Sequence, residues 1–233
     1  MRAPIILAVD TADLDIAKRW VAATSDSVSL YKLGLEFYLT FGAAGVAAIK
    51  AETDSEIFLD LKLHDIPHTV AGAATAIAHL KPKFLTVHAS GGGQMVAAAV
   101  SAAPDIEITA VTILTSLSDQ DLFDIGYANP ALESAVALAK LSVKGGARAI
   151  VCSPLEIGAI RAAVGSDTKI ITPGVRPASV EVSDDQKRTM TPREAIAAGA
   201  DYVVIGRPIT GSWGQGEIAL TAKARYIADE ILN

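Results

Sequence analysis

The amino-acid sequence predicts an α/β protein that forms a single (β/α)8 barrel, a TIM barrel, over residues 1–233. Three observations predict this fold. Short apolar runs alternate with segments at helical spacing, the alternation occurs eight times, and 233 residues is a suitable length for one barrel. A doubly wound sheet is the alternative, but it usually has fewer strands for this length. The sequence shows no linker, low-complexity tract or second domain.

The eight units follow one another along the chain. The first apolar run ends at Asp10, and the segment after it carries apolar residues at helical spacing around Lys18 and Arg19. The same reasoning predicts these strands and helices in order: 5–10 with 14–23, 29–35 with 38–50, 57–63 with 69–80, 84–88 with 93–102, 108–114 with 130–143, 149–152 with 155–164, 169–172 with 192–198, and 202–205 with 217–232. Helical connections of this kind join parallel strands.

Composition excludes several classes of protein. Hydrophobic residues make up 51% of the chain and the mean hydropathy is +0.37. No stretch of about 18 uninterrupted apolar residues occurs, so we expect no membrane span, and a buried parallel sheet accounts for the apolar excess. The formal net charge is −6 and no basic run is present, which argues against a nucleic-acid partner.

The N-terminus and the cysteine content indicate a cytoplasmic protein. Residues 1–4 lead straight into the first predicted strand, without the apolar core and cleavage site of a signal peptide. Cys152 is the only cysteine, which excludes an internal disulfide and a multi-cysteine metal site. We expect it to pack within a strand.

The segment 60–69, DLKLHDIPHT, is the strongest chemical signal. Residues two apart on a strand share a face, so Asp60 and Lys62 should lie side by side, with Asp65 just beyond on the outgoing loop. Two acids flanking one ammonium group would keep it protonated, whereas a Schiff-base lysine needs the opposite environment. Lys62 is therefore predicted to be a proton donor. A structural ion-pair cluster is the alternative interpretation.

Other polar residues stand at the carboxyl ends of the predicted strands. In a barrel these ends meet on one face, where the loops build the functional site. We therefore expect one constellation from the following residues: Asp10, Lys32, Asp60, Lys62, His88, Thr112, Thr115, residues 173–176 and residues 206–207.

Gly206 and Arg207 predict a phosphate site after the last strand. Glycine lets the backbone approach a ligand, arginine matches a phosphate, and the loops after the last two barrel strands often bind phosphate. The polar segment 176–190 is predicted to be a mobile lid, in which Arg176 and Gln186 offer hydrogen bonds to the phosphate. A turn with a solvated arginine and an ordinary surface loop are the respective alternatives.

Two further patterns predict no chemistry. The glycines 91–93 lack the Lys-Ser/Thr ending of a P-loop and are better explained by a tight turn. The 4 histidines show no recognisable metal-ligand spacing, so we predict no metal site.

Taken together, these segments resemble one known family. Segment 60–69 resembles the DxKxxDIPxT signature of orotidine 5'-phosphate decarboxylase, which makes UMP in pyrimidine biosynthesis. The resemblance continues through YKLG at 31–34, VTILTS at 111–116, TPGVR at 172–176, Gln186 and VIGRPI at 204–209. It thus covers nearly the whole chain in order.

The resemblance implies decarboxylation of orotidine 5'-phosphate without a cofactor, with Lys62 as the proton donor to carbon 6. It also implies a homodimer in which Asp65 and Thr69 reach the partner's site, so that Asp60, Lys62 and Asp65 form a charged array. By the same resemblance, Asp10 and Lys32 should bind ribose hydroxyls, and Pro173 should line the pocket for the base. Thr115 and Ser116 should face the pyrimidine, and which of the two makes the main contact is left open. The phosphate should be held by Arg176, Gln186, Gly206 and Arg207.

Two alternatives to this function remain. Sugar-phosphate enzymes of the same suprafamily, such as 3-keto-L-gulonate 6-phosphate decarboxylase and hexulose phosphate synthase, share the DxKxxD core but need magnesium. Ile66, Pro67, Thr69 and Gln186 favour the nucleotide enzyme. A catalytically silent nucleotide-binding barrel is the second alternative, because fold does not dictate function.

Overall fold

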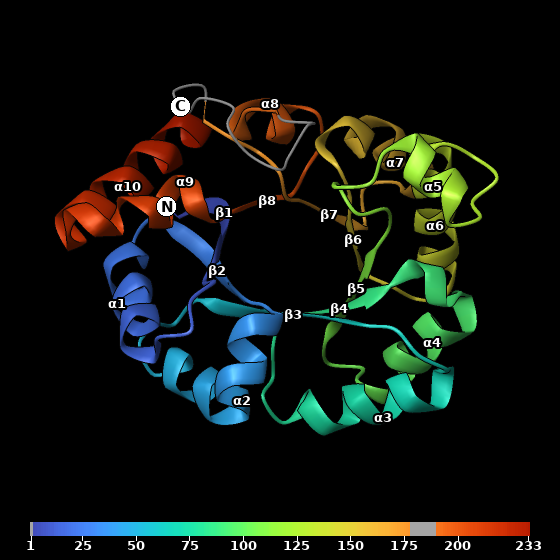
Figure 1. Ribbon diagram of the computed structural model, residues 1–233, viewed down its shortest axis with the longest axis horizontal. Coiled ribbons are helices and arrows are strands. Elements are labelled where there is room, and N and C mark those ends of the chain that lie inside the picture. The colour runs from blue at the N-terminus through green and yellow to red at the C-terminus, as the bar shows by residue number, and fades with distance from the viewer. Residues whose placement is uncertain (1, 178–189) are drawn as a thin grey trace.

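Eight parallel strands close into a barrel in the order β1 to β8 (Figure 1). The structure is a computed structural model that describes residues 2–177 and 190–233. The strands are β1 (Ala3–Ala8), β2 (Val28–Leu33), β3 (Glu56–Leu63), β4 (Phe84–His88), β5 (Glu107–Val111), β6 (Ala149–Val151), β7 (Lys169–Thr172) and β8 (Tyr202–Ile205). The predicted fold class, an α/β barrel of eight units, is confirmed.

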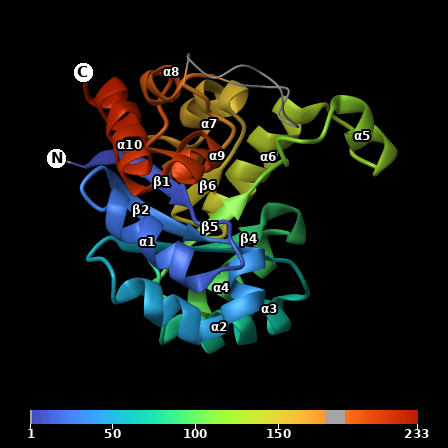
Figure 2. The same ribbon diagram turned by 60° about the vertical axis from the view of Figure 1, so that its left-hand side comes forward.

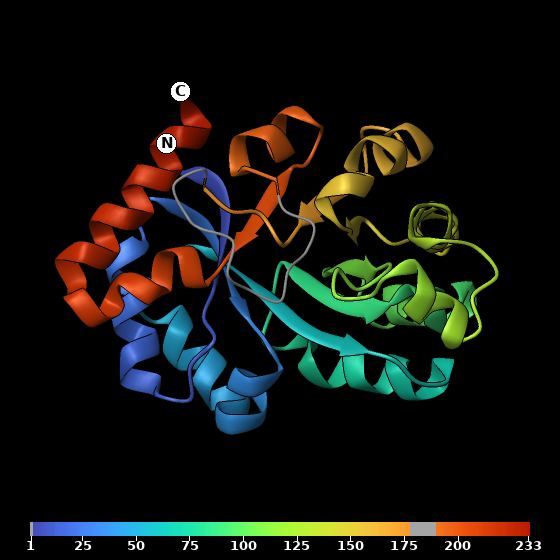
Figure 3. The ribbon, with the colours of Figure 1, turned by 45° about the horizontal axis from the view of Figure 1, so that its top comes forward.

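Helices connect the strands and lie around the outside of the barrel (Figures 1 and 3). The longer ones are α1 (Leu14–Thr24), α2 (Leu35–Lys50), α3 (Pro67–Ala78), α4 (Gly93–Ala102), α6 (Ala131–Lys144), α7 (Ile157–Val164) and α10 (Glu217–Leu232). The helix α8 (Pro192–Ala197) follows the segment after β7. Each of these elements agrees with a predicted helix to within a few residues.

Short helices in the loops were not predicted from the sequence. They are η1 (Ala89–Gly91), α5 (Asp119–Asp124), α9 (Arg207–Thr210) and η3 (Gly211–Gln215), whereas η2 (Pro154–Glu156) overlaps the start of the predicted helix 155–164. Elements of one or two turns are too short to show a hydrophobic period. Figure 2 shows α5 projecting away from the barrel. Most of these short helices follow the carboxyl ends of strands, on the face where the polar residues gather.

Local side-chain contacts determine where several helices begin. The Asp13 carboxylate accepts the backbone N–H of Ile16 at 3.0 Å and caps α1. Proline at position 67 begins α3, where a missing N–H costs nothing. Thr191 and Glu194 form a reciprocal capping box at α8. These contacts fix the residues at which α1, α3 and α8 begin.

Apolar side chains fill the interior of the barrel beneath the polar end. This inner cluster contains Ile6, Leu30, Phe58, Phe84, Ala149 and Ile171. The rings of Phe58 and Phe84 meet edge to face with centroids 5.7 Å apart. Because Phe58 lies two residues before Asp60 on β3, this packing forms a closed floor directly beneath the charged residues.

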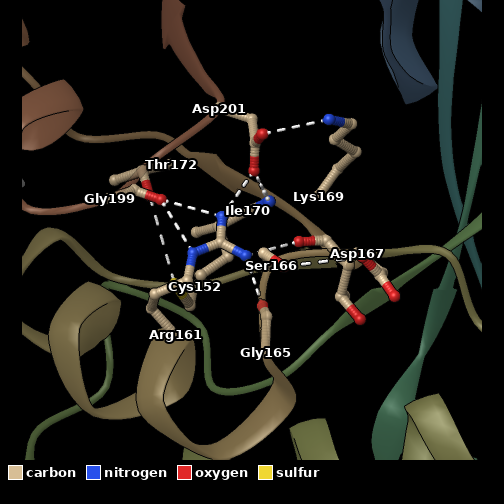
Figure 4. A network of polar contacts seen from close by, with 11 residues as sticks. Cys152, Arg161, Gly165, Ser166, Asp167, Lys169, Ile170, Thr172, Gly199 and Asp201 are labelled. Atoms are coloured by element: carbon tan, nitrogen blue, oxygen red, sulfur yellow. Dashed lines mark hydrogen bonds and ion pairs between the residues drawn. The ribbon is translucent and has the colours of Figure 1, made fainter.

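Arg161 of α7 ties together the amino ends of β7 and β8 (Figure 4). Its guanidinium donates to the carbonyl oxygens of Gly165 at 2.6 Å, Thr168 at 2.7 Å and Gly199 at 2.9 Å. It also pairs with the Asp201 carboxylate at 2.6 Å. One side chain therefore satisfies several backbone acceptors at the end of the barrel opposite the strand carboxyl ends.

We predict that Arg161→Met lowers the free energy of unfolding by about 2–3 kcal/mol, because it leaves the carbonyls and the half-buried Asp201 carboxylate without this donor. The measurement is a urea unfolding curve. Arg193→Met is the control, since Arg193 is exposed and its guanidinium donates to the carbonyl oxygen of Asn233. A loss as small in Arg161→Met as in the control, about 0.5 kcal/mol or less, would contradict this account.

Candidate active site

Four charged side chains alternate in sign across the carboxyl ends of β1, β2 and β3. The Lys32 ammonium lies 3.3 Å from a carboxylate oxygen of Asp10 and 3.5 Å from one of Asp60. The Lys62 ammonium donates to both carboxylate oxygens of Asp60, at 2.8 Å each. The expected proximity of Asp60 and Lys62 is confirmed, and Lys32 joins them as a second cation beside the same carboxylate.

Asp60 is a buried anion held in its charged form by these neighbours. Only 8% of the residue is exposed. Burial by itself raises the pKa of its carboxyl group, but the Lys32 and Lys62 charges and hydrogen bonds from Lys62 and Thr86 outweigh that effect, and the pKa lies below its usual value. Asp60 is therefore an anion throughout the neutral pH range.

The backbone at Lys62 departs from a regular strand. Lys62 has φ 47°, in the left-handed region, and the pairing of β3 with β4 changes register between Leu59 and Leu63. The backbone N–H of Lys62 instead donates to the Thr86 hydroxyl at 2.8 Å. Strand alternation thus correctly predicted that Lys62 and Asp60 are neighbours, but an irregularity in the strand directs the Lys62 side chain.

Asp65 forms no ion pair with this charged group within the described part of its own chain. It is exposed, and its carboxylate accepts the backbone N–H of Ile66 at 2.6 Å. Among residues 2–177 and 190–233, no ion pair joins Asp65 to Lys62. Thr69 is also exposed, in the first turn of α3. The simple expectation that two acids of one chain flank Lys62 is therefore corrected: one acid, Asp60, does so here.

A cavity of about 200 Å³ opens beside the charged group. Its polar walls are Lys32, Asp60, Lys62 and Thr115, and Pro173 closes one side. Ser116 is exposed and lies outside the lining. The remaining wall is almost entirely apolar: Phe58, Val111, Ile113, Leu114, Val151, Cys152 and Val204.

A second cavity of about 190 Å³ adjoins the first and shares Lys32, Pro173 and Val204 with it. It brings together four more of the candidates: Asp10, Arg176, Gly206 and Arg207. A larger cavity of about 520 Å³ lies at the amino ends of the strands and shares no residue with either. The two joined cavities therefore contain most of the strand-end residues singled out in the sequence, but not His88 or Thr112. Thr112 is buried and its hydroxyl donates to the carbonyl oxygen of Val151 at 3.0 Å, and the His88 ring lies beside the His64 ring with centroids 5.3 Å apart.

The predicted lid, 176–190, lies mostly outside the described residues, and so does Gln186. The two ends of the segment are described and meet beside the second cavity. The backbone N–H of Arg176 donates to the carbonyl oxygen of Met190 at 2.9 Å. The first and last residues of the segment are therefore joined by a backbone hydrogen bond, at Arg176, which lines the second cavity.

Sequence reasoning missed the apolar wall of the first cavity and the role of Thr86. The wall residues look like ordinary core positions in the sequence, and alternation along the strands was the available signal that they point inward. Within the described residues, no cluster of three or more His, Cys, Asp or Glu side chains could hold a metal ion. No helix there is long and apolar enough to cross a membrane.

Comparisons with known proteins decide the family. The model of the orotidine 5'-phosphate decarboxylase / HUMPS family matches residues 3–221. This chain belongs to that family. An orotidine 5'-phosphate decarboxylase from Thermobifida fusca (strain YX) is 53% identical over 224 residues, covering 96% of this chain and 96% of that protein.

Other members of the family agree in sequence and in structure. An orotidine 5'-phosphate decarboxylase from Gluconobacter oxydans (strain 621H) is 46% identical over 217 residues, covering 90% of this chain and 91% of that protein. The crystal structure of an orotidine 5'-phosphate decarboxylase from Lactobacillus acidophilus superposes with a TM-score of 0.84 at 32% identity, covering 99% of this chain and 100% of that one. The resemblance found in the sequence motifs is confirmed.

We predict that the Cys152 thiol in the cavity wall does not react in the folded protein. Burial raises its pKa to about 12, so the thiolate needed for reaction is scarce at neutral pH. With Ellman's reagent at pH 7.5, labelling should be at least about 100-fold slower than in guanidinium chloride, where the thiol has its ordinary pKa. Rapid stoichiometric labelling of the native protein would contradict this prediction, and Cys152→Ser should give no signal in either condition.

Proposed function

We propose that this chain decarboxylates orotidine 5'-phosphate to UMP in de novo pyrimidine biosynthesis, in the cytoplasm and without a metal or cofactor. The observation that carries the proposal is the pair of joined cavities. One has apolar walls of a kind that suits a flat base and opens onto the Lys62 ammonium, while the other contains Arg176 and Arg207. A nucleotide likewise has a flat base at one end and a phosphate group at the other.

The substrate would extend across both cavities. Arginine pairs well with phosphate. A Cβ at Gly206 would lie 3.3 Å from the Ala8 Cβ, which is a tight contact, so glycine suits this position. Asp10 and Lys32, at the junction, would bind ribose hydroxyls. The full set proposed for substrate binding is Asp10, Lys32, Thr69, Thr115, Ser116, Pro173, Arg176, Gln186, Gly206 and Arg207, with residues 176–190 closing as a lid over the phosphate.

The proposed chemistry breaks the bond between carbon 6 and the carboxylate. The electron pair of that bond stays on carbon 6 as a vinyl-type carbanion, and carbon dioxide leaves. No neighbouring group of the ring accepts the pair, so stabilisation must be local and electrostatic. Lys62 supplies a cation there and transfers a proton from its ammonium group to carbon 6, which yields UMP and a neutral amine that recovers its proton from solvent.

Asp60 would contribute through its charge. Its buried carboxylate holds Lys62 by two hydrogen bonds and would lie close to the substrate carboxylate. The resulting repulsion is relieved when carbon dioxide departs, and the phosphate contacts keep the substrate in place meanwhile. Binding energy from the remote phosphate would thus be used at the reacting carbon.

A homodimer would complete this site. Asp65 and Thr69 are exposed and point to no charged partner within the described part of their own chain, and Ile66 between them is 64% exposed. We propose that Asp65 reaches the partner's Lys62 and that Thr69 reaches the partner's ribose site.

The magnesium-dependent sugar-phosphate reaction is the second candidate, because the family that matches includes both kinds of name. The apolar wall favours a pyrimidine over a sugar, whose hydroxyl groups would lose hydrogen bonds to water there without replacement. The curated relatives named above also carry the decarboxylase name.

The first test follows the absorbance of orotidine 5'-phosphate in buffer with EDTA. We expect conversion to UMP that EDTA does not inhibit, and a reduction of roughly 100- to 10,000-fold or more in Lys62→Ala. Lys83→Ala is the matched control, since both lysine side chains are 30% exposed and ion-paired, but Lys83 pairs with Glu107 at the opposite end of the barrel. Activity that EDTA abolishes would favour the sugar-phosphate reaction, and normal activity in Lys62→Ala would remove Lys62 from the mechanism.

The second test mixes inactive Asp65→Ala protein with inactive Lys62→Ala protein. If Asp65 crosses the interface, a hybrid dimer has one site with both defects and one intact site. Random exchange should then restore about a quarter of the wild-type activity. Mass spectrometry of differently tagged subunits verifies exchange. Hybrid dimers without activity would contradict a shared site.

A further inference from the structure

Thr86 of β4 connects the two central charged residues through a single hydroxyl group. It is fully buried, at 0% exposure. Its Oγ1 donates to a carboxylate oxygen of Asp60 at 3.0 Å and accepts the backbone N–H of Lys62 at 2.8 Å. A hydroxyl has one proton and two lone pairs, so both roles are satisfied at once.

The Lys62 contact stabilises a backbone conformation that is otherwise unfavourable. A left-handed φ is unfavourable for a residue with a Cβ, and it persists only where the surroundings determine it. The register change between Leu59 and Leu63 takes the Lys62 N–H away from regular pairing with β4. Thr86 accepts that N–H, which compensates for the lost strand hydrogen bond.

The Asp60 contact orients the carboxylate. Lys32 approaches Asp60 from β2 and Thr86 approaches it from β4, so the neighbouring strands hold it from both sides. The carboxylate so oriented presents both oxygens to the Lys62 ammonium. Thr86 therefore affects Lys62 in two ways: it accepts the backbone N–H of Lys62, and it orients the Asp60 carboxylate with which Lys62 pairs.

We infer that Thr86 is a positioning residue for the decarboxylation, because its hydroxyl holds the Lys62 ammonium and the Asp60 carboxylate in their reacting arrangement. The inference rests on the proposed function. Thr86 itself does not line either cavity, so it acts through its two neighbours. Small displacements of catalytic groups lower the rate strongly, whereas substrate affinity comes mainly from the separate phosphate contacts.

The test compares Thr86→Val, which keeps the shape and removes the hydroxyl, with Thr86→Ser, which keeps the hydroxyl. Thr109→Val is the matched control: Thr109 lies on the next strand, is also fully buried, and donates to the carbonyl oxygen of Glu107 at 3.0 Å, away from the charged group. We expect kcat for orotidine 5'-phosphate to fall about 10- to 100-fold in Thr86→Val with KM changed by less than about threefold. Thr86→Ser should keep kcat within about threefold, and Thr109→Val should match the wild type.

The pH profile provides a second measure that a purely structural role would not change. The Thr86 hydrogen bond is one of the contacts that lower the pKa of Asp60, so its loss raises that pKa. The acidic limb of kcat should therefore move to higher pH in Thr86→Val and stay in place in Thr109→Val. If Thr86→Val does not fold, Thr86→Ala replaces it in both measurements.

The outcomes separate this inference from the proposed function. Wild-type protein that does not convert orotidine 5'-phosphate overturns both. Active wild type with an unchanged kcat in Thr86→Val overturns only the role of Thr86. An equal loss of kcat in Thr86→Ser or in Thr109→Val also overturns it, because the effect would then follow from packing and not from the hydroxyl.

Discussion

The buried Asp60 carboxylate, held between two ammonium groups, is the interaction on which the site depends. Burying a charge is costly unless it is paired and hydrogen-bonded. Here the compensating groups come from three neighbouring strands: Lys32 from β2, Lys62 from β3 and Thr86 from β4. The arrangement therefore requires β2, β3 and β4 to be adjacent and parallel, because only neighbouring strand ends bring these side chains within contact distance of one carboxylate.

The barrel also determines where a ligand can lie. Phe58 and the other inner side chains close the interior from below, so the cavities beside the charged group open only at the carboxyl ends of the strands. The two cavities there share Lys32, Pro173 and Val204, and they differ in character, one mainly apolar and one with arginines. This separation supports a division of labour in which phosphate binding at one end holds the substrate against charged groups at the other.

Much of this could be predicted from the sequence because it depends on local patterns. Alternating strand-like and helical segments identified the barrel, and the position of Gly206 and Arg207 after the last strand placed them beside residues 173–176. The short helices η1, α5 and α9 were missed, because one turn has no measurable period. The irregular backbone at Lys62 was also missed, since it follows from the pairing of β3 with β4.

The sequence by itself determined the fold class, the family and the identity of most residues at the site, because each depends on residue order along single strands and loops. Only the tertiary structure decided that Lys32 shares Asp60 with Lys62, that Thr86 links Asp60 to the Lys62 backbone, and that Asp65 forms no ion pair with Lys62 within the described part of its own chain. These are contacts between separate strands, or the direction of a loop in space. Strand register and barrel closure decide them, and neither leaves a pattern within one segment of the sequence.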